Sequence, residues 1–198
     1  MMQQIESLKQ ALPLLNDNDR GFAQSLLAAA ARWRGWTDKQ LFWANKLIEK
    51  ANNPKPQPTK VGDLAPILEL FQKAGKKLKN PAIVLSTPDT GAIRVTIAGI
   101  RSKYPGTLSI TGLGKFEERP WFGRVNKDGT FTPGRDAAGK EAPLTGLLSR
   151  FAAEPAKVAS EHGKVTGCCC FCNRALDDKR SVAVGYGPVC AENYGLTW

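Results

Sequence analysis

The chain of 198 residues is long enough for one ordinary domain or two small ones, and its hydrophobic content of 42% is typical of a globular protein. Twenty-eight Lys and Arg against eighteen Asp and Glu leave a formal net charge of +10, which favours polyanionic partners, most often nucleic acid. No uninterrupted apolar run approaches the roughly 20 residues of a membrane span, and the N-terminus lacks the apolar core of a signal peptide, so we expect a cytoplasmic protein without a membrane partner.

Residues 1–51 are predicted to form a helical hairpin region. Apolar residues recur at helical spacing over 3–16, 22–33 and 41–48. The segment 37–40, Thr-Asp-Lys-Gln, is a capping box that opens the last of these helices. Basic and aromatic side chains interleave around the preceding turn, which fits either a small core with a basic rim or a surface that stacks on bases. They are Arg32, Trp33, Arg34, Trp36, Lys39, Phe42, Trp43 and Lys46.

The polar segment 52–60 contains three prolines and is predicted to be an extended linker between domains. An α+β domain is predicted over residues 61–165. It begins with a helix that Asp63 caps, and the lysines at its end, Lys73 to Lys79, either offset the helix dipole or face phosphate. The domain closes with two helices, over 144–151 and 155–162.

Between these helices the hydrophobic period changes to two, which predicts short strands separated by turns. The predicted strands are 82–87, 92–99, 106–112, 119–125 and 130–132. Five short strands in about fifty residues favour a small antiparallel sheet or a partial barrel over a parallel sheet. Strict alternation puts Trp121 and Gly123 on one face of the fourth strand and Phe122 and Arg124 on the other.

A sheet that binds single-stranded nucleic acid presents a basic groove with exposed aromatic side chains. The strands and the loop 99–106 supply such residues. The candidate set is Arg94, Arg101, Lys103, Tyr104, Lys115, Arg119, Trp121 and Arg124.

Residues 166–198 hold all five cysteines of the chain. Cys169 and Cys172 form a C-x2-C knuckle, and Cys190 follows eighteen residues later, so the three can occupy three corners of a zinc tetrahedron. Clustered cysteines without a secretory signal favour metal over disulfides. The usual fourth cysteine is replaced by Asn193. The fourth ligand stays open among His162, Cys168, one residue of the pair Asp177–Asp178, and water.

The run CCFCNRALDDKRSVAVGYGPVCAENYGL closely resembles the C-terminal zinc-ribbon-like module of an uncharacterised protein family of tailed phages and prophages. The shared marks are the CxxC, the Arg-x-Leu, the Ser, and Gly-Tyr-Gly-Pro-x-Cys-Ala. The stretch WFGRVNKDGTFTPGRDA is similar to the middle part of such proteins. The resemblance implies a bound Zn²⁺, a nucleic-acid or replication setting and the cytoplasm of a bacterial host. It implies no reaction.

Basic residues around the knuckle, Arg174, Lys179 and Arg180, are further candidates for phosphate contacts. We therefore expect a phage-encoded, zinc-containing accessory protein that binds nucleic acid, DNA rather than RNA, single-stranded or without sequence preference, in replication or recombination. One alternative is an adaptor or inhibitor that binds a host or phage polymerase or nuclease. Another is a zinc-dependent enzyme, but no general base or activated nucleophile accompanies the cysteines, so a structural zinc and no enzymatic activity are expected.

Overall fold

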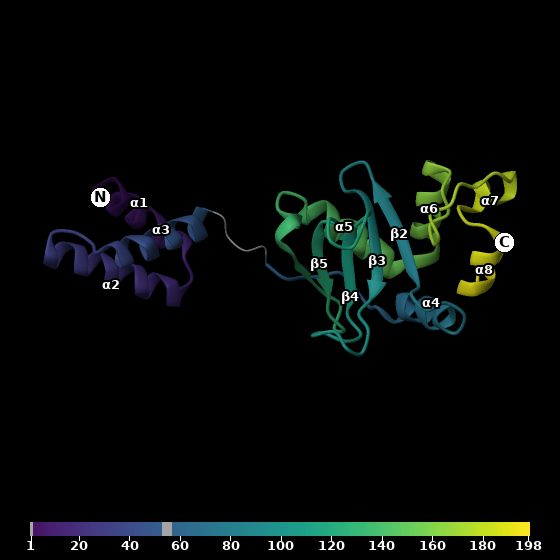
Figure 1. Ribbon diagram of the computed structural model, residues 1–198, viewed down its shortest axis with the longest axis horizontal. Coiled ribbons are helices and arrows are strands. Elements are labelled where there is room, and N and C mark those ends of the chain that lie inside the picture. Colours follow the sequence, from purple (N-terminus) through teal and green to yellow (C-terminus); the bar gives the residue numbers. More distant parts are fainter. Residues whose placement is uncertain (1, 53–56) are drawn as a thin grey trace. The chain divides into compact units, whose positions relative to one another are not determined.

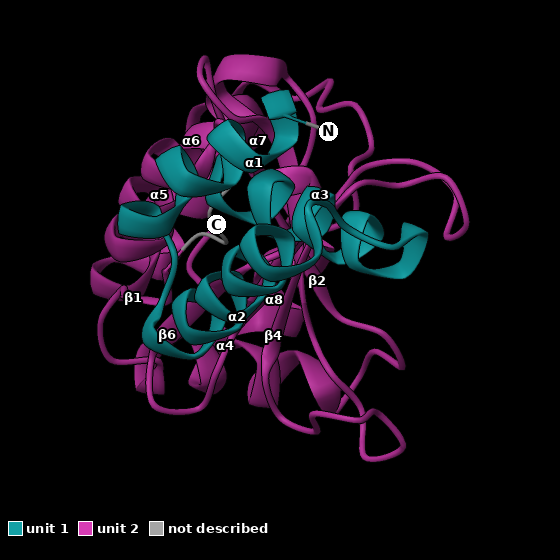
Figure 2. Ribbon diagram, turned by 90° about the vertical axis from the view of Figure 1, so that its left-hand side faces the viewer, with its two compact units in different colours: residues 1–55 teal, residues 56–198 magenta. Residues whose placement is uncertain are grey.

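The structure is a computed structural model that describes residues 2–52 and 57–198 (Figure 1). The chain divides into two units, residues 1–55 and residues 56–198 (Figure 2). The described residues form eight α-helices and one six-stranded antiparallel sheet, which confirms the predicted α+β class. None of the described helices has both the length and the hydropathy needed to cross a bilayer.

Unit 1 contains the helices α1 (Met2–Ala11), α2 (Asp17–Trp33) and α3 (Asp38–Asn52), with a 3-10 turn at Leu12–Leu14. Pro13 lies in this turn, and α1 ends before it because proline has no N–H to continue the helix, so the helical spacing over 3–16 does not correspond to one continuous α-helix. The predicted capping box is present. The Gln40 amide donates to Thr37 Oγ1 over 3.3 Å, and the Thr37 amide donates to Gln40 Oε1 over 2.9 Å.

The interleaved aromatic residues of unit 1 divide between its core and its surface. Trp36 is buried, and its indole N–H donates to the Leu26 carbonyl over 2.6 Å. Trp33, by contrast, is 72% exposed, and Phe42 and Trp43 are exposed and pack edge to face with ring centroids 5.5 Å apart. One tryptophan therefore belongs to the core, as the first interpretation predicts, whereas Trp33, Phe42 and Trp43 lie on the surface, and their stacking on bases stays a prediction.

The predicted linker differs from the structure at both of its ends. Asn52 is still in α3, residues 53–56 lie outside the described part, and Thr59–Lys60 forms a short strand, β1. Strand β1 pairs antiparallel with Thr130 and Phe131. Residues 59–60 therefore belong to the sheet rather than to a spacer, because a partner strand far along the chain supplies the hydrogen bonds that local sequence does not reveal.

The sheet of unit 2 contains all five predicted strands in addition to β1. They are β2 (Ala82–Thr87), β3 (Gly91–Ile97), β4 (Leu108–Gly112), β5 (Trp121–Val125) and β6 (Thr130–Pro133). Their order is β1-β6-β5-β4-β3-β2, and every neighbouring pair is antiparallel. The sheet is therefore open rather than closed into a barrel.

One face of the sheet packs against α4 (Ala65–Gly75), α5 (Glu141–Ala153) and α6 (Pro155–Thr166). Alternate residues of the strands enter this core, among them Ile83, Leu85, Ile93, Val95, Leu108, Ile110, Phe122, Val125 and Phe131. The residues between them lie on the opposite face, which we call the outer face. Over β3, β4 and β5 the outer face consists of Arg94, Thr96, Ser109, Thr111, Trp121 and Arg124.

The strict alternation predicted for β5 is wrong, because a β-bulge interrupts this strand. Arg124 pairs with Ser109, but Trp121 pairs with Thr111, because the register shifts at Gly123. Gly123 adopts φ +131°, which a side chain rarely permits. Phe122 is therefore buried in the core, whereas Trp121 and Arg124 share the outer face.

The C-terminal segment 166–198 forms a knuckle followed by two short helices, α7 (Lys179–Val184) and α8 (Pro188–Tyr194), rather than a ribbon of strands. Its buried residues Cys170, Phe171 and Tyr194 belong to the same core as the sheet. The segment therefore packs as part of unit 2 and not as the separate module that the sequence predicts. In Figure 1, α6, α7 and α8 lie beyond the β2 edge of the sheet.

A pair of glycines brings α6 and the C-terminal segment into backbone contact. A Cβ on Gly163 of α6 would overlap the carbonyl group of Gly185. Gly185 ends α7 with φ +85°, and a Cβ there would overlap the Ser160 carbonyl. Glycine is required at both positions because no side chain fits between the two backbones.

We predict that Gly163→Ala lowers the free energy of unfolding by about 1–3 kcal/mol, since the added methyl group forces the two backbones apart. Gly146 is a matched control, because it lies exposed on α5 with open space at its Cβ position. Gly146→Ala should raise the free energy of unfolding by about 0.5–1 kcal/mol. Urea unfolding followed by far-UV circular dichroism measures both, and an equal stability gain in the two variants would contradict the packing described.

Candidate metal centre

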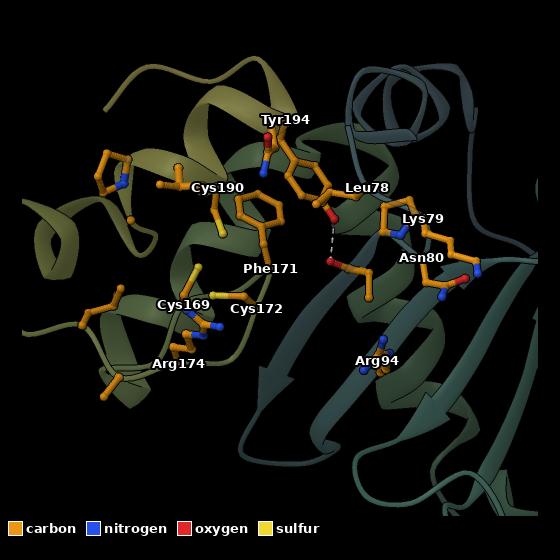
Figure 3. Close-up of a pocket in the computed structure, with 18 residues that line it drawn as sticks. Leu78, Lys79, Asn80, Arg94, Cys169, Phe171, Cys172, Arg174, Cys190 and Tyr194 are labelled. Carbon is orange, nitrogen blue, oxygen red and sulfur yellow. Dashed lines mark hydrogen bonds between the residues drawn. The ribbon is translucent and has the colours of Figure 1, made fainter. Parts of the chain in front are cut away.

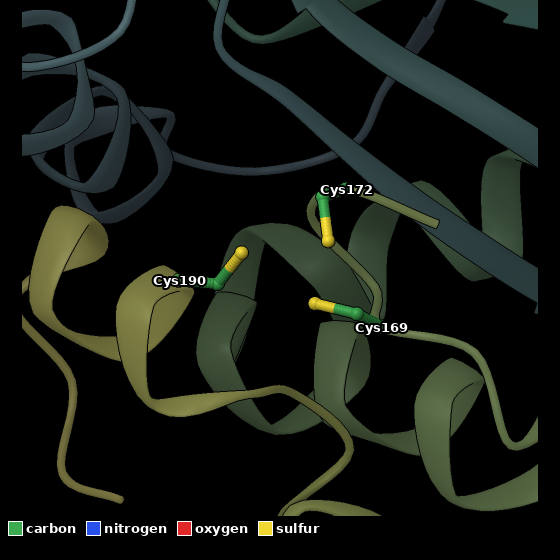
Figure 4. A group of neighbouring side chains, drawn as sticks. All are labelled: Cys169, Cys172 and Cys190. Carbon is green, nitrogen blue, oxygen red and sulfur yellow. The ribbon is translucent and has the colours of Figure 1, made fainter. Parts of the chain in front are cut away.

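The structure brings together the three cysteines that the sequence proposes as metal ligands. The Sγ atoms of Cys169, Cys172 and Cys190 lie within 4.8 Å of one another (Figure 4). The first two belong to the knuckle, and Cys190 projects from α8. A tetrahedral site with Zn–S bonds of about 2.3 Å places its sulfur atoms about 3.8 Å apart. The three thiols therefore fit three corners of a metal site after a small closure.

Hydrogen bonds within the knuckle favour a thiolate at Cys169. The Asn173 amide donates to the Cys169 carbonyl over 2.8 Å, and Asn173 itself adopts φ 60°, which closes the turn. The pKa of Cys169 is lowered to about 5, first because the Cys190 thiol donates to its sulfur. Backbone amides also point at this sulfur, from Cys172, Phe171 and Gly187. The same sulfur–sulfur contact, together with burial, raises the pKa of Cys190.

The proposed fourth ligands His162 and Cys168 lie outside the sulfur group among the described residues. His162 is buried on α6 with Nδ1 2.9 Å from Ser86 Oγ, and burial lowers the pKa of its imidazole. Cys168 forms a β-bridge with Ala175 and does not belong to the sulfur group. Asp178 caps α7, since its carboxylate accepts from the Ser181 amide over 2.7 Å. The fourth corner is therefore not filled by these side chains.

A pocket of about 630 Å³ adjoins the sulfur group, and all three cysteines line it (Figure 3). Its other walls come from the segment 78–81 between α4 and β2, from β2 and β3, and from α8. They include the apolar side chains of Leu78, Phe171, Leu176, Val189 and Tyr194 and the polar ones of Lys79, Asn80, Arg94, Arg174 and Asn193. The open corner of the metal site thus faces a cavity of the size that small ligands occupy.

The outer face collects three of the predicted nucleic-acid residues, Arg94, Trp121 and Arg124. Arg94, Thr111 and Trp121 are neighbours across three strands, and Arg124 lies in the next row. The Trp121 indole packs over Gly134 and is 36% exposed. Tyr104 from the β3–β4 loop covers Arg124, whose guanidinium carbon lies 3.7 Å from the centre of the tyrosine ring. A basic and aromatic surface therefore runs across β3, β4 and β5.

The remaining candidates lie around this surface or apart from it. Arg101 and Lys103 are exposed in the loop that carries Tyr104, and Lys115 and Arg119 lie in the β4–β5 loop, where Arg119 packs on Phe116. Arg174 belongs to the pocket. Lys179 and Arg180 are on α7, and Arg180 packs on Trp198 and donates to its carbonyl.

Asn80, Phe171 and Tyr194 line the pocket although the sequence marks none of them as a site residue, and Lys79, one of the lysines with a predicted phosphate-facing alternative, lines it too. Tyr194 and Phe171 stack with ring centroids 3.9 Å apart, and the Tyr194 hydroxyl donates to the Ala82 carbonyl over 2.8 Å. Lys79 and Asn80 precede β2 directly. No local pattern joins these residues in one site, because the pocket forms only when β2 meets the knuckle.

Comparison with known proteins gives one match. A family of unknown function, DUF6011, matches residues 159–195, about a fifth of the chain, which covers most of α6, the knuckle, α7 and α8. Neither a curated protein nor a solved structure matches the chain. The matched residues contain all three cysteines of the sulfur group, so the likeness is confined to the candidate metal centre and its supports.

We predict that Cys172→Ser lowers the Zn²⁺ affinity by at least about 100-fold, since even residues that only orient a metal ligand cost 10- to 100-fold when changed. Cys168→Ser is the matched control and should retain full affinity, because Cys168 is outside the sulfur group. Competition with a chromogenic chelator measures both affinities. A loss of affinity in Cys168→Ser equal to that in Cys172→Ser would show that the ligand set differs from this group.

Proposed function

We propose that the protein is a zinc-containing accessory protein that binds single-stranded DNA, without strong sequence preference, across the outer face of its sheet. The observation that carries this proposal is the row of Arg94, Thr111 and the exposed Trp121 beside the Arg124–Tyr104 pair. Proteins that bind single strands combine cations along the backbone with aromatic rings on which bases stack.

Three properties of the outer face support the proposal. The core helices pack on the opposite face, so a strand can lie across the outer one. Its aromatic residues are held in place, Trp121 over Gly134 and Tyr104 over Arg124. The flanking loops add Arg101, Lys103, Lys115 and Arg119, in line with the net charge of +10. Cations at these positions release counterions from phosphates and so bind without reading the base sequence.

The Zn²⁺ is proposed to have a structural role, joining the knuckle to α8. Among the described residues that line the adjoining pocket there is no histidine and no carboxylate to act as a general base. We therefore propose that the protein is not an enzyme. A role in phage replication or recombination, in the cytoplasm of a bacterial host, rests on the resemblance of the C-terminal sequence to phage proteins.

A second candidate function is that of an adaptor for a host or phage protein, and the surface of unit 1 favours it. Phe22, Phe42 and Trp43 form an exposed aromatic cluster, with Phe22 and Trp43 ring centroids 6.2 Å apart. Aromatic residues gathered in this way are typical of the centres of protein interfaces. If this function applies, Trp43→Ala should abolish a stoichiometric complex with a purified polymerase or nuclease that Trp121→Ala leaves intact.

We predict that Trp121→Ala weakens binding of a labelled oligothymidylate by about 5- to 150-fold, the effect of losing one base–aromatic stack. Fluorescence anisotropy of the zinc-loaded protein over a salt series measures the affinity. The logarithm of the affinity should fall linearly with the logarithm of the salt concentration, because phosphate contacts release counterions. Arg101→Glu and Lys103→Glu should weaken binding and reduce this slope.

Trp33→Ala is the comparison variant, since Trp33 is an exposed tryptophan of unit 1. Its affinity should stay within about twofold of the parent protein, well below the effect of one lost stack. A loss in Trp33→Ala without a loss in Trp121→Ala would move the nucleic-acid site to unit 1. Flat anisotropy at low salt with single-stranded and duplex DNA and RNA would overturn the proposed function.

A further inference from the structure

The charged side chains that line the pocket beside the sulfur group are all positive. Lys79, Arg94 and Arg174 line it, and its described lining contains no aspartate or glutamate. In Figure 3, Arg174 lies beside Cys169 and Cys172, whereas Lys79 lies across the pocket and Arg94 is on the bordering strand. The three cations thus approach the cavity from separate parts of the chain, the knuckle, the segment between α4 and β2, and β3.

These cations have no protein partner in the part of the chain that the structure describes. None of the three makes a side-chain hydrogen bond or an ion pair there, and Arg94 Nε is buried without an acceptor. Two other lysines on and just after α4 do have carboxylate partners. Lys73 pairs with Glu69 over 2.8 Å, and Lys77 pairs with Glu192 over 2.5 Å. A buried guanidinium donor without an acceptor is costly unless a ligand supplies one.

The metal centre does not account for all three positive charges. Three thiolates and one Zn²⁺ carry a formal charge of −1, so one of the three cations is enough to balance them. The remaining charge of +2 matches a phosphate monoester, which carries about −1.5 to −2 at neutral pH. An internal phosphodiester carries only −1, so the balance favours a terminal phosphate.

The rest of the pocket fits the nucleoside attached to such a phosphate. A volume of about 630 Å³ is within the range of small-molecule sites. Leu78, Leu176 and Val189 give apolar walls for a flat base, and Asn80 and Asn193 offer amide donors and acceptors at its edges. Arg94 also begins the row that leads to Trp121 on the outer face.

We propose that this pocket binds a terminal nucleotide, with Arg94 and Lys79 holding its phosphate monoester and Arg174, beside the cysteines, balancing the charge of the metal centre. The proposal rests on the proposed function, because the nucleotide is taken to be the end of a strand that crosses the outer face. A free mononucleotide presents the same chemistry, and the two sources are separated by experiment.

The test uses isothermal titration calorimetry on the zinc-loaded full-length protein. Deoxyadenosine 5′-monophosphate should bind at least about tenfold more tightly than deoxyadenosine, as expected for charge-assisted phosphate contacts. Arg94→Gln should lower the affinity for the mononucleotide by about tenfold or more. Lys79→Gln should also weaken it, and because Lys79 is exposed this variant leaves the fold intact. Lys164→Gln, an exposed change on α6 away from the pocket, should bind as the parent protein does.

Oligothymidylates with a 5′-phosphate, a 3′-phosphate or only hydroxyl ends identify the source. A phosphorylated end should bind more tightly than the hydroxyl form, and Arg94→Gln should remove the preference. Equal affinity of nucleotide and nucleoside, or unchanged affinity in both Arg94→Gln and Lys79→Gln, would overturn the proposal.

The same data separate this proposal from the proposed function. Oligonucleotide binding that depends on Trp121, with no mononucleotide binding, would exclude the pocket as a nucleotide site and support the outer face as the DNA-binding surface. Mononucleotide binding without oligonucleotide binding would support the pocket as a site for a free nucleotide. It would exclude single-stranded DNA binding as the function of the protein.

Discussion

One hydrogen bond fixes the relation between the sheet and the metal centre. The Val84 amide at the free edge of β2 donates to the Cys170 carbonyl over 2.6 Å. This contact covers an edge strand that would otherwise offer its N–H groups to another chain. It also buries Cys170 and Phe171, so that Cys169 and Cys172 are free to face Cys190. The position of the sulfur group and of the pocket both follow from the docking of this knuckle on β2.

Because the knuckle is part of the main core, a metal ion here has a different effect from one in a small independent module. In an independent module the binding free energy of the metal is nearly the whole folding free energy. In unit 2, contacts between protein groups also hold these elements, since Tyr194 anchors α8 to Ala82 and α6 contacts Gly185 through Gly163. A metal at the three cysteines therefore adds to packing that already exists and mainly sets where α8 and its side of the pocket lie.

The features of this structure that could be predicted from the sequence are those that depend on residues close together in the chain. The capping box at Thr37 and the period-two strands from Ala82 onward depend on neighbouring residues, and both are present. The bulge at Gly123, strand β1 and the pairing of Val84 with Cys170 depend on partners far along the chain. These long-range contacts decide that Trp121 and Arg124 share a face and that Lys79 lines the same pocket as the three cysteines. Periodicity alone cannot give either result.

Arg94 connects the two surfaces that the proposals concern. It lines the pocket, and it also starts the row of the outer face that ends at Trp121. A DNA strand could bind the pocket with its terminal phosphate and the outer face with its bases. Its affinity would then be higher than for either contact alone, since the second contact becomes intramolecular once the first has formed. Such a combination favours strand ends over internal positions without any reading of base sequence. The unpaired guanidinium of Arg94, placed where the two surfaces meet, is the feature from which that preference would arise.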